Sequence, residues 1–177
     1  MPLPYPAHWI QTLTLRDGAV VTLRPIRPED AAIEAEFVRN LSDESRYNRF
    51  MDHLRELPPY MLSHFTEVDY DNHMALIATT DVHGAEMQIG VARYVVIPDT
   101  TQCEFALAVA DAWQRRGIGR RLMQRLIEAA RARGLTSMYG DVLPANNKLL
   151  ALTQNLGFKS SFDPSDMSTI RVELALV

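Results

Sequence analysis

The stretch that decides the fold is Val109-Ala-Asp-Ala-Trp-Gln-Arg-Arg-Gly-Ile-Gly-Arg-Arg-Leu-Met123. It follows an apolar run over residues 102–110 that predicts a β-strand. It opens a helix that we expect over residues 118–133, because apolar residues recur there at helical spacing. Gly134 suits the end of this helix, since glycine readily adopts the left-handed conformation found there. A strand, a glycine-containing loop and a helix in this order favour an anion site at the helix N-terminus.

The glycine-containing loop has the properties of a phosphate site. The first N–H groups of a helix have no partner within the helix, and the helix dipole adds positive potential there. Gly117 and Gly119 carry no Cβ, so a bulky pyrophosphate could approach the backbone closely. Four arginines could add charge-assisted hydrogen bonds to phosphate oxygens: Arg115, Arg116, Arg120 and Arg121. The spacing fits neither a P-loop nor a dinucleotide-binding fingerprint, so the residues alone predict a phosphate-bearing ligand.

The remaining pattern predicts a protein of the α/β class, with a mixed sheet and helices on its faces. Further strands are expected at 13–15, 19–24, 73–80, 86–97, 136–143, 158–162 and 169–176. Further helices are expected at 28–41, 43–53, 58–65 and 146–155. The first two strands indicate a hairpin that turns at Asp17-Gly18. We expect residues 1–18 to form an arm and the start of this hairpin, and residues 19–177 to form a single domain.

The composition limits the possible classes of protein. The 177 residues are 47% hydrophobic and 23% charged, which suits one globular domain. Cys103 is the sole cysteine, which excludes an internal disulfide and a cysteine-based zinc site and fits a reducing compartment. No signal peptide or membrane span is evident, so we expect a cytoplasmic protein without a membrane partner. The net charge of −4 argues against nucleic acid as a partner, and the histidines lack metal-ligand spacing. Monomer and homodimer both remain open.

A resemblance to a known family gives this pattern a function. Gln114-Arg115-Arg116-Gly117-Ile118-Gly119 resembles the Q/R-x-x-G-x-G/A signature of the GNAT acetyltransferases. Asn146 to Leu156-Gly157-Phe158 looks like the family's N-(x)10-G-F element, and the order of elements over residues 19–176 is similar. The resemblance implies the GNAT fold, with a largely antiparallel central sheet, and acetyl-coenzyme A (acetyl-CoA) as cofactor. The cofactor-binding residues that it implies are Leu107, Ala108, Val109, Gln114, Arg115, Arg116, Gly117, Ile118, Gly119, Arg120, Asn146 and Leu149.

Two upstream segments narrow the resemblance. Residues 23–30 (Leu-Arg-Pro-Ile-Arg-Pro-Glu-Asp) and 41–50 (Leu-Ser-Asp-Glu-Ser-Arg-Tyr-Asn-Arg-Phe) look like the acetyltransferase domain of bacterial protein lysine acetyltransferases. This likeness implies a protein lysine as the acceptor. It also places Arg46, Tyr47 and Arg49 along the acceptor cleft, although these residues could instead only cap a helix. His73, near the start of a strand, could line the cleft as well.

Acyl transfer to an amine requires a base, because an alkyl ammonium with a pKa near ~10.4 cannot attack a thioester. Glu104 is the candidate. Strand alternation places it on the same face as Ala106 and Ala108, so that one carboxylate stands above small side chains. The family often uses a glutamate on this strand as its base, commonly through water. A bulge in the strand could disturb the alternation, and a half-exposed residue without a role is the alternative interpretation.

The proton donor for the leaving thiolate is harder to predict. Many family members carry a tyrosine just before the G-F element that fills this role, whereas Thr153 stands there in this chain. Tyr139 could substitute, but a buried strand tyrosine is the simpler interpretation. Cys103 neighbours Glu104 but faces the opposite side of the strand, so we expect a buried, inert thiol rather than a nucleophile.

The sequence therefore predicts an N-acetyltransferase that moves an acetyl group from acetyl-CoA directly to a primary amine, foremost a protein lysine. A small-molecule amine or polyamine is the alternative acceptor. Glu67, Asp69 and Asp71 could attract a cationic amine, or they could form a solvated loop. A non-catalytic acyl-CoA sensor and an arginine-rich nucleic-acid binder are the alternatives from other classes. They predict, respectively, no release of free thiol and salt-dependent binding of DNA.

Overall fold

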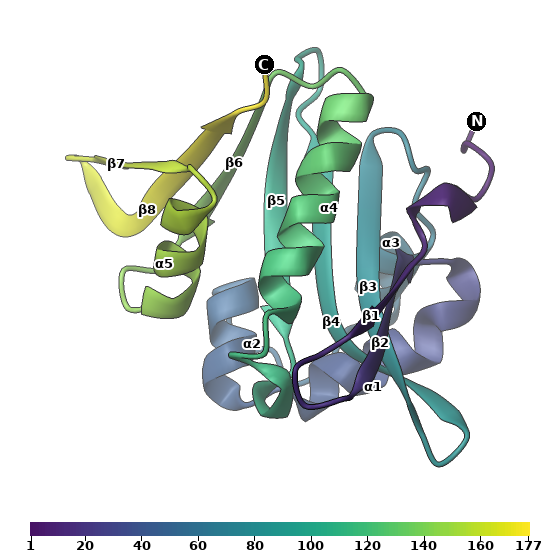
Figure 1. Cartoon of the computed structure of the whole chain (residues 1–177). Coiled ribbons are helices and arrows are strands. Elements are labelled where there is room, and N and C mark those ends of the chain that lie inside the picture. Colours follow the sequence, from purple (N-terminus) through teal and green to yellow (C-terminus); the bar gives the residue numbers. More distant parts are fainter.

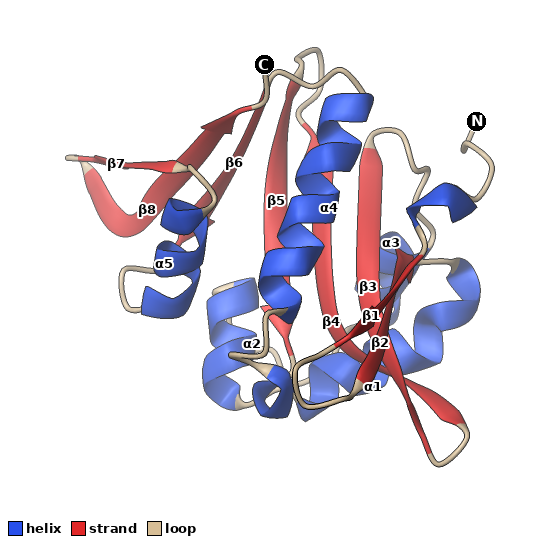
Figure 2. Ribbon diagram, viewed as in Figure 1, coloured by secondary structure: helices blue, strands red, loops and turns tan.

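The computed structural model describes residues 1–177 and contains one eight-stranded sheet with helices on both faces (Figures 1 and 2). The strands follow the order β1-β2-β3-β4-β5-β6-β8-β7 across the sheet. All neighbours run antiparallel except β5 and β6, which run parallel. The predicted mixed, largely antiparallel sheet is confirmed.

The strands are β1 (Gln11–Thr14), β2 (Val20–Pro25), β3 (His73–Val82), β4 (Ala85–Val96), β5 (Gln102–Val109), β6 (Ser137–Val142), β7 (Lys159–Asp163) and β8 (Asp166–Ala175). The helices are α1 (Ala31–Asn40), α2 (Asp43–Phe50), α3 (Pro59–Thr66), α4 (Ile118–Ala132) and α5 (Asn147–Asn155). Single 3₁₀ turns are η1 (Ala7–Trp9), η2 (Pro28–Asp30) and η3 (Asp111–Trp113). Each predicted element is present. Helix α2 ends earlier than predicted because Met51 takes a left-handed conformation with φ of 54°.

The two faces of the sheet carry different helices (Figure 1). Helix α4 packs on one face through the stripe Ile118, Leu122, Leu126 and Ala129, and all four side chains are buried. This stripe is the one that the helical spacing predicts. Helices α1 and α3 cover the other face with a second apolar cluster that includes Phe37, Val38 and Leu57. No helix combines the length and the apolarity that a membrane crossing would require.

The N-terminal arm is held against the rest of the molecule by specific contacts. The N–H of Leu3 donates to the carbonyl of Asp69 at 3.0 Å, and the Tyr5 hydroxyl donates to the carbonyl of Pro25 at 2.9 Å. The guanidinium carbon of Arg125, on α4, lies 4.9 Å from the ring centroid of Trp9. The arm thus links β2, the segment before β3, and α4.

The feature that positions the site is a divergence of two strands. β5 pairs with β6 only over Gln102–Glu104, opposite Ser137–Tyr139, and the two strands separate beyond that point (Figure 1). The buried ring of Phe105 lies at the apex, against Gly140 of β6. A Cβ on Gly140 would lie 2.6 Å from that ring, so only glycine fits there. Phe105 also packs edge-on to Phe158, with ring centroids 5.4 Å apart. An aromatic pair therefore fills the apex.

Candidate active site

The loop before α4 presents a row of free main-chain donors. The N–H groups of Arg115 through Arg120 donate to no backbone or side-chain acceptor in the protein, and the first bond of the helix is Arg121 N–H to the Gly117 carbonyl at 3.1 Å. Gly117 is the N-cap and takes a φ of 84°, a conformation that favours glycine. Buried Ile118 fixes the helix start beside the sheet. These donors at a helix N-terminus fit the phosphates of a coenzyme A moiety.

Gly119 brings this helix start close to the opening between β5 and α5. A Cβ added there would lie 3.5 Å from side-chain atoms of Leu107 and Val109 and 3.6 Å from Leu152. Residues 107–109 belong to the part of β5 that β6 leaves unpaired. The fold thus brings together predicted cofactor-binding residues from β5, from the loop and from α4.

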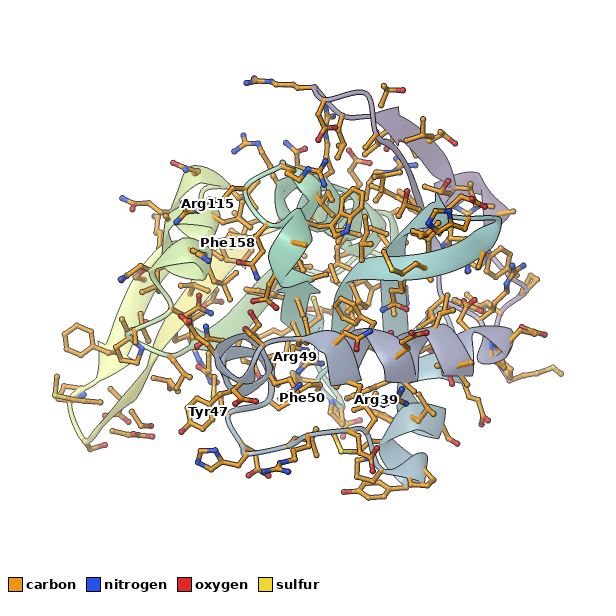
Figure 3. All side chains as sticks on the ribbon, turned by 90° about the horizontal axis from the view of Figure 1, so that it is seen from below. Arg39, Tyr47, Arg49, Phe50, Arg115 and Phe158 are labelled. Carbon is orange, nitrogen blue, oxygen red and sulfur yellow. The ribbon has the colours of Figure 1, made fainter.

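The arginines of the loop differ in how their side chains are used. The Arg116 guanidinium forms an ion pair with Asp17 of the β1–β2 turn and lies 4.2 Å above the Trp113 ring. Its predicted contact with phosphate is therefore limited to the main-chain N–H. The side chains of Arg115 and Arg120 are exposed and form no ion pair, so both remain available to an anion. Figure 3 shows Arg115 near the surface of the molecule.

Gln114 acts as a bridge between elements, a role that the motif does not reveal. Its Nε2 donates to the Val109 carbonyl at 3.0 Å and to Ser45 Oγ at 3.2 Å, while its Oε1 accepts from Lys148 Nζ at 2.8 Å. The side chain therefore links β5, α2 and α5, and its amide is already satisfied by protein groups.

Asp111 joins α2 to the same loop. Its carboxylate accepts from the Ser42 N–H at 2.9 Å and from the hydroxyls of Ser42 and Ser45, both at 2.7 Å. Burial disfavours its ionisation, but these hydrogen bonds outweigh burial and hold the pKa of Asp111 below its usual value. Sequence reasoning missed this residue. Asp111 lies within the motif, but Ser42 and Ser45 are 69 and 66 residues away in the chain, so no local pattern predicts that they bind each other.

The N-cap residue of α5 and one residue inside the helix use their polar side-chain groups to bind the helix backbone. The Asn146 Oδ1 accepts from the Leu149 N–H at 3.3 Å, so this asparagine is an N-cap. Thr153 is fully buried, and its hydroxyl donates to the carbonyls of Leu149 and Leu150 at 3.0 and 3.1 Å. The hydroxyl at this position therefore has no path to a leaving thiolate.

Glu104 lies at the last paired position before β5 and β6 separate. The register places it opposite Val95 on β4 and Tyr139 on β6, so these three side chains share one face of the sheet. Cys103 and Phe105 are buried on the other face, in agreement with the predicted alternation. No register shift interrupts the pairing of β4 with β5. The irregularity of this region lies between β3 and β4, at Ala78 and Thr79.

The Glu104 carboxylate has the electrostatics of a base. Partial burial, followed by the charge of Asp141, raises its pKa, while Arg171 and Arg49 act in the opposite direction. A carboxylate whose pKa moves toward neutrality accepts a proton more readily at neutral pH. The same chemistry excludes Cys103 as a nucleophile, because burial raises the pKa of its thiol to about 12.

Tyr139 lies beside Glu104 and is only half-buried. Arg171 stacks on its ring at 4.2 Å and forms two hydrogen bonds with Asp141, at 3.0 and 3.1 Å. Burial and the charge of Glu104 raise the pKa of Tyr139, so its phenol stays protonated. Tyr139 therefore differs from the buried strand tyrosine of the simpler interpretation, because its side chain is only half-buried and lies beside Glu104.

The four predicted cleft residues separate into two groups. Arg46 donates to the carbonyls of Arg39 at 2.9 Å and Leu41 at 2.6 Å and pairs with Asp43, so it joins the end of α1 to α2. His73 is 8% exposed and lies 3.1 Å from Arg93; burial and that cation lower its pKa to about 3. Arg46 therefore fits the alternative interpretation of a helix cap, and the His73 side chain lies in the protein interior.

Tyr47 and Arg49 form the second group. Tyr47 is 40% exposed and packs against His53, with ring centroids 5.2 Å apart. Arg49 lies over the rings of Phe50 and Phe65. Figure 3 shows Tyr47 on the outer side of α2, while Arg49 and Phe50 point toward the middle of the molecule. These two residues remain available to an acceptor near β5.

The acidic stretch before β3 has structural partners. One Asp69 oxygen accepts the N–H groups of Asp71, Asn72 and His73, at 3.0, 2.9 and 2.9 Å. Asp71 forms an ion pair with Arg133, just after α4. Asp69 and Asp71 therefore cap and anchor a turn, which leaves neither carboxylate free to attract a cationic amine.

Comparison with known proteins identifies the family. Residues 35–158 match the model of the acetyltransferase (GNAT) family. The chain belongs to this family. It is an acetyl-CoA-dependent acetyltransferase with the GNAT fold, and enzymes of this family act on amine acceptors.

Relatives of this GNAT protein span nearly all of the chain. An acetyltransferase of Pseudomonas aeruginosa is 35% identical over 169 residues, which cover 96% of this chain and 90% of the relative. The acetyltransferase Pat of Mycolicibacterium smegmatis is 32% identical over 144 residues, 81% of this chain but only 42% of that protein. The crystal structure of the GNAT domain of S. lividans PAT superposes with a TM-score of 0.87 at 31% identity, covering 97% of this chain and 99% of that one.

Proposed function

We propose that this enzyme acetylates the side-chain amine of protein lysines, with Glu104 as the general base. The observation that carries the proposal is the open setting of Glu104. Val95 beside it is 37% exposed, and Glu173, opposite Tyr139 on β8, is exposed as well. Two hollows of the surface lie away from Glu104, one between β2, β3 and β4 and one near the end of α4. An open polar surface suits a lysine presented by a protein, whereas a small amine is usually enclosed.

The likeness to the Pat proteins supports the same proposal. The matched region includes α1 and α2, which lie on the face of β5 that carries Glu104. The segment 41–50 consists of α2 and the two residues before it. Residues outside the cofactor loop thus share in the resemblance. The acceptor of this chain is inferred from that likeness together with the open surface.

In the proposed site, the chain performs three tasks. The N–H groups of Arg115–Arg120 bind the pyrophosphate, and the unpaired edge of β5 at 107–109 aligns the acyl arm beside Glu104. Glu104 accepts the proton that the amine must lose before it attacks the thioester, directly or through one water. Bound acetyl-CoA supplies the activated acetyl group, and Thr153 takes no part in the transfer.

The test is an acceptor screen on the whole chain. Release of free thiol from acetyl-CoA is measured with lysine-containing peptides, with spermidine and other small amines, and with a denatured bacterial proteome whose acetylated sites are mapped by mass spectrometry. We expect acetylation at lysine side chains and kcat/KM values for the best peptide at least tenfold above those for any small amine. A reversed preference would reject the lysine assignment and establish a small-amine acetyltransferase.

A further inference from the structure

The backbone of the loop before α4 is strained at one residue other than glycine. Arg115 has a φ of 62°, in the left-handed region that a Cβ disfavours. Gln114 before it has a φ of −69° and a ψ of 157°, so the two residues approach the shape of a type II turn, which normally carries glycine at its third position. Gly117 also has a positive φ, of 84°. The loop therefore passes twice through a left-handed conformation, and only the second position is a glycine.

Main-chain hydrogen bonds do not hold this conformation. The N–H groups of Arg115 and Arg116 donate to no acceptor in the protein, so no bond closes the turn between its ends. A strained residue keeps its conformation only where its surroundings impose it. The restraint must therefore come from the side chains on either side.

Both neighbours of Arg115 are fixed by their side chains. The Gln114 amide is bound by groups of β5, α2 and α5. The Arg116 guanidinium forms an ion pair with Asp17, and its Cζ lies 4.2 Å from the centroid of the Trp113 ring. Arg115 is thus held between two anchored residues, one of which depends on a carboxylate from the N-terminal hairpin.

Asp17 is held in place to receive this guanidinium. It lies in the β1–β2 turn, beside the start of α4 (Figure 1). Its Oδ1 accepts the Ala19 N–H at 3.1 Å, while its Oδ2 pairs with Arg116. Leu13 and Leu15 pack against the main core cluster, so the hairpin is fixed on the rest of the protein. The hydrogen bond from Arg116 lowers the pKa of the Asp17 carboxyl, which is therefore ionised at neutral pH.

We propose that Asp17 is a positioning residue for cofactor binding: through Arg116 on the Trp113 ring, it holds the loop before α4 in its strained shape before acetyl-CoA binds. A protein whose loop already has the binding shape has a higher apparent affinity, because a larger fraction of the molecules is competent to bind. The inference goes beyond the choice of acceptor. It rests on one part of the proposed function, the binding of pyrophosphate by this loop.

A matched pair of variants at Arg115 separates the shape of the loop from its charge. Arg115→Gly and Arg115→Ala remove the same charged side chain, but only glycine adopts the positive φ without strain. Asp17→Asn is then added to each protein. This substitution keeps an oxygen for the Ala19 N–H and removes the charge that binds Arg116. Any direct effect of the Asp17 charge on the phosphates is the same in both proteins and cancels when they are compared.

The readout is the Kd of coenzyme A, measured by isothermal titration calorimetry. We expect the factor by which Asp17→Asn raises the Kd to be about two- to fivefold larger in the Arg115→Ala protein than in the Arg115→Gly protein, the effect of one exposed ion pair. Arg116→Gln breaks the same ion pair from the other side and should show the same dependence on residue 115. Equal factors in the two proteins, or a larger factor in Arg115→Gly, would overturn the inference.

A spectroscopic measurement tests the loop assignment separately. In ¹⁵N-labelled wild-type protein, coenzyme A should shift the amide resonances of residues 115–120, whose N–H groups are free. If these resonances do not respond, the binding of pyrophosphate by the loop is rejected, together with the inference that rests on it. If they respond and the two Kd factors are equal, the inference about Asp17 alone is rejected.

Discussion

The loop before α4 and the face of β5 that carries Glu104 present different parts of the polypeptide to a ligand. The loop offers main-chain N–H groups from Arg115 to Arg120, set by the helix start and by two glycines. The β5 face relies on a balance of side-chain charges, in which Arg93 and Arg171 are paired while Arg49 and Glu104 are not. Binding in the first region therefore depends on the shape of the backbone, and binding in the second depends on the side-chain charges that lack a partner.

The largest effect is expected for Glu104→Gln. The variant keeps the size of the side chain and removes its basicity, so we expect kcat to fall about 10²–10³-fold, the usual contribution of a general base. The affinity for coenzyme A, measured by isothermal titration calorimetry, should stay within about twofold, because the free N–H groups lie in the other region. A kcat close to wild type would show that a different group accepts the proton.

The loop is tested by a matched pair at Gly119. The nearest side-chain atoms lie 3.5 Å from an added Cβ, which is ordinary contact, so Gly119→Ala should bind acetyl-CoA within a few fold of wild type. Gly119→Val adds branches that meet Leu107, Val109 and Leu152. We expect affinity to drop roughly 10–100-fold, in keeping with overpacking costs of about 1–3 kcal/mol. Equal affinities in both variants would argue that α4 does not need its close approach to β5.

The apex between the two regions is tested at Gly140. Because a Cβ there would lie 2.6 Å from the buried Phe105 ring, Gly140→Ala should lower the free energy of unfolding by about 1–3 kcal/mol. Urea denaturation followed by circular dichroism measures this. The double variant Gly140→Ala/Phe105→Leu removes the clashing ring, so its loss should be smaller than the sum of the single losses. Strict additivity would contradict the contact.

The smallest expected effect concerns the link between the regions, Asp111→Asn. Losing its charged hydrogen bonds to Ser42 and Ser45 should cost about 1 kcal/mol of stability at pH 7. The KM for the acceptor should rise more than the KM for acetyl-CoA, because α2 carries Tyr47 and Arg49.

The pH dependence of that loss follows from the sign of the pKa shift. The pKa of Asp111 is lowered in the folded state, so its contribution is fully present above the unfolded value near ~3.9 and is lost as the pH falls through the lower folded value. The stability difference between wild type and Asp111→Asn should therefore shrink in acid. A difference independent of pH down to about 2 would assign the effect to packing.

Most of the fold follows from local sequence signals. The α4 stripe, the turn at Asp17-Gly18 and the Ser42 N-cap each depend on residues close together in the chain, and the structure contains all three. The loop before α4 is equally local, since a helix start and its glycines define the free N–H groups. The parallel contact between β5 and β6, limited to residues 102–104, has no such signal, because strand divergence depends on the packing of Phe105 against Gly140 and Phe158.

The roles of charged side chains were predictable only in part. The alternation that placed Glu104 opposite Cys103 agrees with the burial of β5. The partners of Arg116 and His73 are Asp17 and Arg93, which no spacing rule connects to them. Arg46, by contrast, pairs with Asp43 three residues earlier, a spacing that brings two side chains together on a helix. For Arg116 the partner is 99 residues away in the chain, so its ion pair could not be predicted from the motif.

The unshared N–H donors from Arg115 to Arg120 determine which residues of this loop can be substituted during evolution. In the proposed site the peptide backbone binds the pyrophosphate, so most positions in the loop can exchange their side chains without abolishing the binding of acetyl-CoA. The exposed arginines there are thus free to acquire a second purpose, while the two glycines and the buried isoleucine between them are not.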